Sequence, residues 1–368
     1  MKLIVPRLDL VTLIGRLQSI VSTKPAIPIL ANILLEARDD QLIISATDLT
    51  VSMRAYIEAK VAKEGGIVLP ARQFFQLIRE LLTPTVEIHV TSSGIASINA
   101  GSSHFKLHGM HPQEFPTLPD LSNESSVTLS PGLLKEMFAR TLFSAARDTT
   151  KPILQSVCLQ LNDETITFLS TDGKRMSKIH FKASEVQLPS GSYVIPLKAV
   201  EEIVRLLDEK EESLKLTLMQ DRMAIEVGAT TLITKLLSGQ YPDIVRIIPE
   251  KKAEPLVLHR EELISLLRQV ALFAPEKSCS VKFTFADGAL HLSATHGELG
   301  EGTVNMPVNY SGEKLDIAFN PHFFLDILRH SRDETVHFRI ADSYNPGLVT
   351  DSSTAEFVIM PMRLDVPK

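Results

Sequence analysis

The stretch VIPLKAVEEIVRLL at residues 194–207 has two related copies elsewhere in the chain. It has the pattern of a strand end, a proline and an amphipathic helix. The other copies are VLPARQFFQLIREL at residues 68–81 and AFNPHFFLDILR at residues 318–329. Aligned on the proline or asparagine before each helix, the copies lie 126 and 124 residues apart. A repeat at this interval predicts three similar structural units.

Each copy predicts a helix with two distinct faces. One face is apolar at positions i, i+3 and i+4, which is the spacing of a buried helix face. These positions are Phe74, Leu77 and Ile78, then Val200, Ile203 and Val204, then Phe324, Ile327 and Leu328. The other face carries two cationic positions seven residues apart, so both point the same way. These positions are Arg72 and Arg79, Lys198 and Arg205, and His322 and Arg329.

Other segments recur at the same interval. Three threonines, Thr47, Thr171 and Thr295, lie 124 residues apart, and each follows a segment that alternates as a strand does. We expect strands at residues 41–45, 165–170 and 289–293, and a first helix of each unit at residues 8–21, 131–146 and 261–273. Two helices with many antiparallel strands per unit predict an α+β fold. Breaker-rich segments place the predicted domains at residues 1–122, 126–248 and 254–368.

Composition narrows the class of protein. With 44% hydrophobic and 22% charged residues, the 368-residue chain has the composition of a soluble globular protein. No apolar run reaches the length of a membrane span, and two cysteines predict no disulfide framework, so we expect a cytoplasmic protein. The net charge of −6 means that any nucleic-acid binding depends on local cationic patches.

The sequence does not predict a catalytic or metal site. His104, His108 and His111 lack nearby cysteines or carboxylates, so we expect no metal there. Residues 173–175 lack the glycine spacing and the hydroxyl residue of a phosphate-binding loop. Asp48 and Asp172 occupy matching repeat positions, where we expect them to cap turns rather than act as acids.

Seven motifs in order resemble the bacterial sliding clamps, the β subunits of DNA polymerase III. They are IPILAN at 27–32, TDL at 47–49, LPARQFF at 69–75, FPTL at 115–118, TDGKR at 171–175, LLSGQYPD at 236–243 and VIMPMRL at 358–364. The resemblance implies three domains per chain and a head-to-tail homodimeric ring of six domains. It implies helices around a pore for duplex DNA, bound without sequence preference, and it implies no cofactor.

The resemblance also implies which residues contact DNA. Besides the repeated helix positions Arg72, Arg79, Lys198, Arg205 and Arg329, they are Lys24, Arg147 and Lys151. His322 and the first-helix residues Arg16, Lys135, Arg140 and Arg268 are further candidates. Glu202 and Asp326 lie among the repeated cations, so we expect the face to guide DNA loosely. Solvated helix surfaces with intrahelical charge pairs are the alternative explanation of these charges.

The family's partner site is a pocket for a short peptide motif. The motif is shared by the polymerase III catalytic subunit, the clamp loader and other clamp-binding proteins. The resemblance places its wall at Leu154, Thr171, Gly173, Arg175, Met176, Pro242, Arg246, Ile247, Val358, Met360, Pro361, Met362 and Arg363. Methionine is a flexible lining that adapts to several partners, and we expect the arginines to hold polar groups of the peptide at the rim. A terminal core strand whose methionines only pack is the alternative.

The family dimerises through its first and third domains. The resemblance places apolar contacts at Phe105, Leu107, Leu272 and Phe273, and acidic residues at Glu298 and Glu301. The histidines and the small number of charges at this interface predict that dimer dissociation depends weakly on salt and more strongly on pH. The function that the resemblance implies is a non-catalytic processivity factor of replication. A soluble enzyme or a peptide-binding scaffold on the same repeats is the alternative.

Overall fold

The computed structural model describes residues 1–22, 25–121, 124–162, 165–182, 190–207, 212–249, 254–276 and 278–363. These residues form two compact units. The first comprises Met1–Lys135 and Lys198–Leu237, and the second comprises Glu136–Leu197 and Ser238–Lys368. The predicted domain limits at 1–122, 126–248 and 254–368 remain a prediction.

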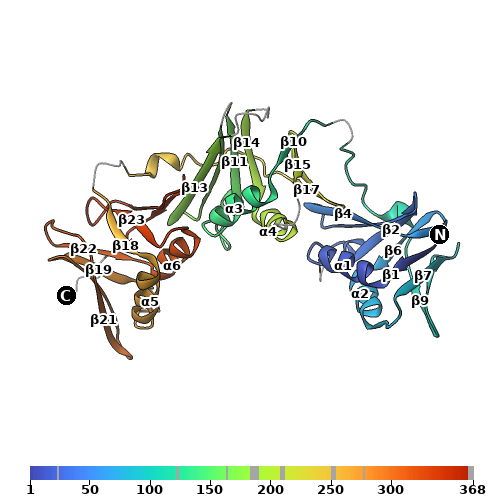
Figure 1. Cartoon of the computed structure of the whole chain (residues 1–368), viewed down its shortest axis with the longest axis horizontal. Coiled ribbons are helices and arrows are strands. Elements are labelled where there is room, and N and C mark those ends of the chain that lie inside the picture. Colours follow the sequence, from blue (N-terminus) through green and yellow to red (C-terminus); the bar gives the residue numbers. More distant parts are fainter. Residues whose placement is uncertain are drawn as a thin grey trace. The chain divides into compact units, whose positions relative to one another are not determined.

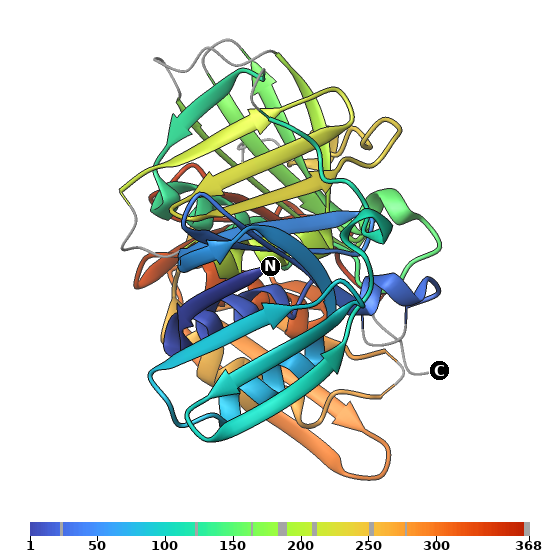
Figure 2. The ribbon, with the colours of Figure 1, turned by 90° about the vertical axis from the view of Figure 1, so that its right-hand side faces the viewer.

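The first unit contains two antiparallel sheets. The smaller has the strand order β5 (Lys60–Lys63), β1 (Lys2–Pro6), β7 (Thr85–Val90), β8 (Ile95–Ala100) and β9 (Ser103–His108). The larger has the order β10 (Ser126–Leu129), β15 (Leu214–Leu218), β16 (Arg222–Val227), β17 (Thr230–Lys235), β4 (Val51–Glu58), β3 (Gln41–Thr47), β2 (Asn32–Arg38) and β6 (Gly65–Pro70). Figure 2 shows the cyan and teal strands of the smaller sheet in front of the blue helices. In β1 every second residue is buried, as expected of a strand with one face on the core.

Among the described residues, the first unit includes the α-helices α1 (Arg7–Leu17), α2 (Ala71–Glu80) and, from its second residue, α4 (Leu197–Leu206). α1 and α2 lie side by side (Figure 1). α2 buries Phe74 and Ile78 completely, because residues four apart share one side of a helix. α4 buries Val200 and Ile203 in the same way. These positions of the predicted apolar faces are confirmed, and the remaining two, Leu77 and Val204, are half-buried.

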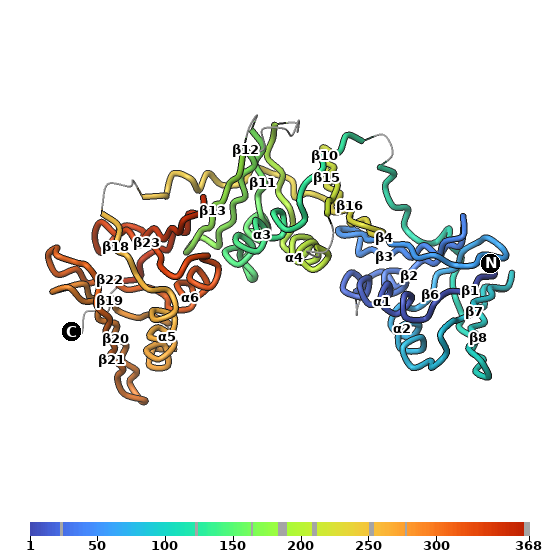
Figure 3. The backbone as a smooth tube through the Cα atoms, in the orientation of Figure 1, coloured from blue at the N-terminus to red at the C-terminus, as the bar shows by residue number. Residues whose placement is uncertain are grey.

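Pairing between β4 and β17 joins segments far apart in the sequence within the first unit. The register places Ser52 opposite Ile233 and Val51 opposite Thr234. Figure 3 labels β16, β4 and β3 along this sheet, in which β17 lies between β16 and β4. This pairing makes one continuous larger sheet.

The second unit also contains two antiparallel sheets. The larger has the order β14 (Gly191–Pro196), β11 (Ser156–Asn162), β12 (Thr165–Thr171), β13 (Arg175–Lys182), β25 (Glu356–Ile359), β24 (Gly347–Thr350), β23 (Thr335–Arg339) and β18 (Leu256–His259). The smaller has the order β21 (Gly300–Pro307), β20 (Ala289–His296), β19 (Val281–Ala286) and β22 (Leu315–Phe319). Its helices are α3 (Pro131–Leu142, from Glu136 on), α5 (Arg260–Ala271) and α6 (Pro321–His330).

An aromatic cluster forms the core beneath α6. The Phe324 ring lies 5.2 Å from that of Phe283 and 5.3 Å from that of Phe338, centroid to centroid, and all three side chains are fully buried. Offset and edge contacts at these distances are favourable beyond the area they bury. The apolar face of α6 is thereby fixed on the sheets, and its cationic positions remain outside.

The predicted first helices are present but shorter than expected. α1 ends at Leu17 rather than residue 21, α3 at Leu142 rather than 146, and α5 at Ala271 rather than 273. In each case the chain leaves the helix through a tighter turn, as where the Ile20 amide donates to the Leu17 carbonyl at 3.1 Å. Ile20 is nevertheless buried, which is why the apolar spacing continued past the helix end. The predicted strands correspond to β3, β12 and β20.

Among the described residues, every helix is too short or too polar to span a bilayer.

Candidate functional site

The repeated helices expose the cationic positions that the sequence singled out. Arg72 and Arg79 on α2, Lys198 and Arg205 on α4, and His322 and Arg329 on α6 all have exposed side chains. The helices can hold them there because the opposite faces are buried in the two cores. Each unit therefore carries cations on helix surfaces that are accessible to a phosphate backbone.

Carboxylates reduce the positive charge of these helix surfaces, as the sequence predicted. Arg205 pairs with Glu202 at 2.5 Å, and Arg329 pairs with Asp326 at 3.3 Å, both three residues apart. Glu202 is only 5% exposed and also accepts a hydrogen bond from Ser19 at 2.6 Å. Intrahelical pairs are thus present, and they leave the outer edges of the guanidinium groups exposed.

Arg140 is not available to DNA, which corrects the expectation drawn for it. Its side chain is 5% exposed and pairs with Asp351, whose side chain is itself inaccessible. It also donates to the His330 carbonyl at 2.9 Å and to the Ser353 hydroxyl at 2.8 Å. A buried arginine needs such partners, so Arg140 ties α3 to the β24–β25 connection. Among the other first-helix candidates, Arg16 and Arg268 are exposed and Lys135 is half-buried.

The remaining predicted DNA contacts lie in turns. Arg147 and Lys151 are exposed in the segment that follows α3. The Arg147 carbonyl accepts a hydrogen bond from the Gln155 side chain at 3.0 Å, which fixes the backbone of this segment. Lys24 lies outside the described residues.

A tight turn between β12 and β13 carries the centre of the predicted peptide pocket. Thr171 Oγ1 accepts a hydrogen bond from the Gly173 amide at 3.0 Å. Asp172 Oδ1 accepts from the amides of Lys174 at 2.8 Å and Arg175 at 3.0 Å. Asp172 is therefore a turn cap, as predicted. Gly173 has φ +86°, a left-handed conformation that favours glycine, and a Cβ there would meet no atom within 4 Å.

Three segments converge on this turn. β13 pairs with β25, so that Met176 lies opposite Val358, and the Met360 amide donates to the Lys174 carbonyl at 2.9 Å. The third segment contains Tyr241, whose hydroxyl accepts a hydrogen bond from the Thr171 amide at 3.1 Å. The structure thereby brings residues 171–176, 241–247 and 358–363 together in the second unit.

Tyr241 belongs to the LLSGQYPD motif and corresponds to Phe115 in the first unit, but the sequence did not predict it as a site residue. Tyr241 is buried, and this burial raises the pKa of its phenol above the ordinary value. The hydroxyl is therefore a neutral partner for a buried amide. The signal that would have identified it is the change from phenylalanine to tyrosine between matching Phe-Pro and Tyr-Pro segments.

The predicted pocket residues fall into three classes by exposure. Thr171, Met176 and Val358 are buried. Leu154, Met360, Pro361 and Met362 are half-buried, and Gly173, Pro242, Arg246, Ile247 and Arg363 are exposed. The side chain of Arg246 is 84% exposed and pairs with Asp243 at 2.6 Å, which suits a group at a rim.

We expected the pocket arginines to hold polar groups of a peptide at the rim, whereas Arg175 is largely buried and already paired. Its side chain is 10% exposed and pairs with Asp172 at 3.1 Å and Asp326 at 2.7 Å. The guanidinium carbon lies 4.5 Å from the centroid of the Phe323 ring and 5.5 Å from that of Phe143. Asp326 also pairs with Arg329, so one carboxylate connects the turn of the pocket to the exposed face of α6.

The predicted dimer contacts lie on or beside edge strands. Phe105 is exposed and Leu107 half-buried on β9, which ends the smaller sheet of the first unit. β21 ends the smaller sheet of the second unit, and Phe273 packs on it where a Cβ at Gly302 would come within 2.5 Å of the ring. Leu272, Glu298 and Glu301 are exposed. An edge strand offers unpaired backbone groups to another chain.

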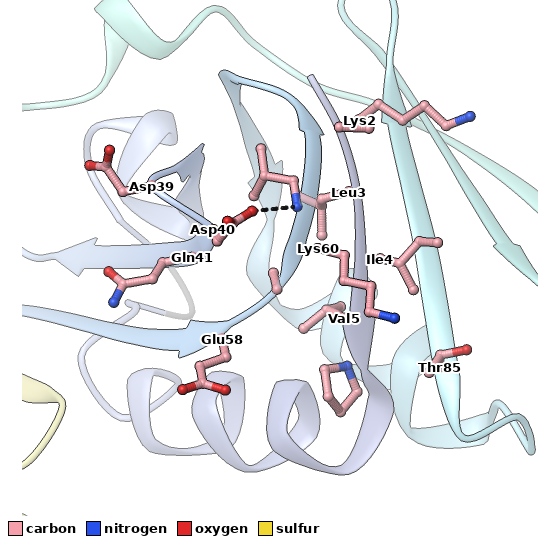
Figure 4. A pocket seen from close by; sticks show the side chains of 14 residues that line it. Lys2, Leu3, Ile4, Val5, Asp39, Asp40, Gln41, Glu58, Lys60 and Thr85 are labelled. Atoms are coloured by element: carbon pink, nitrogen blue, oxygen red, sulfur yellow. Dashed lines mark hydrogen bonds between the residues drawn. The ribbon is translucent and has the colours of Figure 1, made fainter.

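A wide cleft opens on the first unit at β1 and β5 (Figure 4). It has a volume of about 890 Å³. The Val61 amide donates to the Asp40 side chain across its wall at 3.4 Å, and Lys2, Lys60 and Glu58 are exposed around it. The sequence did not single out these residues, because their types are ordinary for edge strands and turns.

Among the residues that the structure describes, no group of three or more histidine, cysteine or acidic side chains is placed to hold a metal ion. Cys158 is buried and Cys279 half-buried, and both are free.

Comparison with known proteins assigns these features to one family. Models of the DNA polymerase III beta subunit match its N-terminal domain at residues 1–119, its central domain at 128–243 and its C-terminal domain at 245–363. The beta sliding clamp of Chlamydia muridarum is 49% identical over 99% of both chains.

Solved structures agree. The DNA polymerase III subunit beta from Pseudomonas aeruginosa has a TM-score of 0.94 at 27% identity, covering 99% of this chain and 100% of that one. The DNA polymerase sliding clamp from Bacillus subtilis has a TM-score of 0.94 at 25% identity, covering 99% of both.

Proposed function

The chain belongs to the DNA polymerase III beta subunit family, the sliding clamps, and we propose that it acts as a homodimeric ring that encircles duplex DNA. In this family the chain is a processivity factor of DNA replication. The ring slides along DNA without sequence preference and holds the polymerase III catalytic subunit to its template. It is an accessory subunit without catalysis of its own, and it works in the cytoplasm.

The observation that carries the proposal is the repeated cationic face of α2, α4 and α6. All six matched positions are exposed, whereas the apolar positions of the same helices are buried or, at Leu77 and Val204, half-buried. Each phosphate that a protein neutralises steepens the salt dependence of binding by about 0.9 in log–log slope. Carboxylates at Glu202 and Asp326 keep the net charge of this face low. Retention on DNA then comes from closure of the ring rather than from affinity.

Ring closure joins β9 of one subunit to β21 of the other in this proposal. Both are edge strands with exposed apolar residues beside them. Partner proteins bind at the Thr171–Arg175 turn, where half-buried Met360 and Met362 offer an adaptable surface. The partners are the polymerase catalytic subunit, the clamp loader and other proteins with the clamp-binding peptide motif.

Retention on circular DNA tests the proposal. The protein is loaded onto nicked circular DNA with a clamp loader and ATP, and the circle is then cut once. A clamp stays on the circle and is lost from the linear molecule. If the amount of bound protein is the same before and after the cut, encirclement is rejected. A soluble enzyme or peptide-binding scaffold on the same repeats is then favoured. The control is the same linearised DNA with a bound protein blocking each end, which should retain the clamp.

A further inference from the structure

The Thr47–Val51 turn of the first unit has the same internal hydrogen bonds as the Thr171–Arg175 turn. Thr47 Oγ1 accepts from the Leu49 amide at 3.0 Å. Asp48 Oδ1 accepts from the amides of Thr50 at 2.9 Å and Val51 at 2.7 Å. Each of these bonds has a counterpart 124 residues later, so the two turns present the same backbone shape.

A following strand closes on both turns in the same way. The Lys235 amide donates to the Thr50 carbonyl at 2.9 Å, just as the Met360 amide donates to the Lys174 carbonyl at 2.9 Å. β17 runs beside β4 as β25 runs beside β13. The first unit thus repeats the framework of the predicted peptide pocket.

A cavity of about 120 Å³ lies on this framework in the first unit. Leu49, Pro116, Leu118 and Ile233 contribute apolar walls. An apolar cavity of roughly 150 Å³ admits a benzene ring, so this one has room for a single apolar side chain. The segments that line it are the Thr47–Val51 turn, the end of β17 and residues 116–119, which correspond to the Thr171–Arg175 turn, β25 and the Pro242 segment of the second unit.

Two cations stand at the same cavity. Arg222 and Lys235 both line it, Lys235 is exposed, and Arg222 is half-buried beside exposed Asp221 at 3.3 Å. The counterpart of Lys235 in the second unit is Met360, an uncharged residue. Negative charge next to the apolar group of a ligand therefore complements Lys235 and Arg222 at the first cavity.

We propose that this cavity is a second peptide-binding site, which takes an acidic linear peptide with one apolar anchor side chain. The comparison of frameworks rests on the proposed function of the second-unit pocket, whereas the cavity and its cations do not. Leu49, 40% exposed with φ +74°, replaces Gly173 and narrows the site. Lys235 in place of Met360 and Leu49 in place of Gly173 distinguish the two sites of one chain.

Photo-crosslinking with a defined probe tests the site on the full-length protein. The probe is a capped pentapeptide of alternating aspartate and photo-reactive leucine. Pro116→Arg obstructs the first-unit cavity, and Pro242→Arg is the matched change at the equivalent position of the second unit. Lys235→Glu reverses a charge on an exposed side chain, so it tests the site without disturbing a core. Lys60→Glu is a charge control on β5.

We expect crosslinks in residues 47–52, 116–119 or 233–235 of the unmodified protein. Pro116→Arg should reduce them about tenfold and Lys235→Glu about threefold to tenfold, whereas Pro242→Arg and Lys60→Glu should leave them unchanged. Crosslinks confined to the second unit, no crosslinks at all, or first-unit crosslinks that survive both Pro116→Arg and Lys235→Glu would overturn the inference. Retention on circular DNA does not depend on this cavity, so failure here leaves the proposed clamp function standing.

Discussion

Replacement of Arg140 by methionine tests whether this arginine is structural rather than a DNA contact. The change keeps an unbranched side chain of similar length but removes the guanidinium. The carboxylate of Asp351, whose side chain has no solvent access, then loses its ion-pair partner, and the His330 carbonyl and Ser353 hydroxyl lose a donor. The perturbation is therefore an unpaired carboxylate inside the second unit.

The expected cost is large because the partners are buried. Removing one member of a buried ion pair costs about 3–5 kcal/mol, so Arg140→Met should lower the free energy of unfolding by that amount. Asp351 keeps other hydrogen bonds, from the Arg332 amide at 2.9 Å and the Ser353 amide at 3.0 Å. These remaining donors place our expectation at the lower end of the range.

Circular dichroism during urea denaturation measures this cost, since the chain contains no tryptophan to report by fluorescence. The matched control is Arg246→Met, which removes an arginine from an exposed pair with Asp243. Such surface pairs contribute about 0–1 kcal/mol. A loss below about 1 kcal/mol for Arg140→Met, or equal losses for both variants, would refute the structural role.

The same pair gives the stability a defined pH dependence. Burial acts to raise the pKa of Asp351, but hydrogen bonds from Ser353 and Arg332 and the charge of Arg140 outweigh it and hold that pKa below its usual value. A depressed folded pKa contributes stability above the unfolded value of about 3.9. That contribution is lost as the pH falls through the folded pKa. Arg140→Met should therefore flatten the acid limb of the stability curve.

Three further predictions concern the proposed functions. Tyr241→Phe removes the acceptor of the buried Thr171 amide, so it should cost about 1–3 kcal/mol of stability and weaken peptide binding in calorimetry; unchanged values for both would contradict this. Lys198→Ala and Arg329→Ala should each lower the slope of log affinity for DNA against log salt by about 0.9, with little change in unfolding; an unaltered slope would exclude a phosphate contact. Dimer dissociation should respond more to pH than to salt, because His104 and His108 lie on β9, and a steep salt dependence without a pH effect would reject this.

The repeated helix faces could be predicted because their spacing is local. Phe324, Ile327 and Leu328 lie within one turn and a half of each other, so periodicity alone placed them on the core. Asp48 and Asp172 were equally predictable, since a turn cap bonds to amides two and three residues on.

Ion pairs between residues far apart in the chain could not be predicted from the sequence. Arg140 and Asp351 are separated by 211 residues, and without that partner a helical arginine is expected to be exposed. Arg175 meets Asp326 across 151 residues, which is why its burial was not predicted. The first-unit cavity escaped notice for a related reason. Its walls come from a turn, a Phe-Pro segment and a strand whose proximity only the folded chain defines.

Arg175 in the Thr171–Arg175 turn and Arg329 on α6 compete for the same carboxylate, that of Asp326. Its two oxygens contact Arg175 at 2.7 Å and Arg329 at 3.3 Å. We expect a peptide that draws Arg175 away to leave this carboxylate to Arg329, which reduces the attraction of α6 for phosphate. By thermodynamic reciprocity, DNA that engages Arg329 then strengthens the hold on Arg175 by the same free energy. Asp326→Asn should abolish any dependence of peptide affinity on DNA, and a dependence that persists in this variant would place the coupling elsewhere.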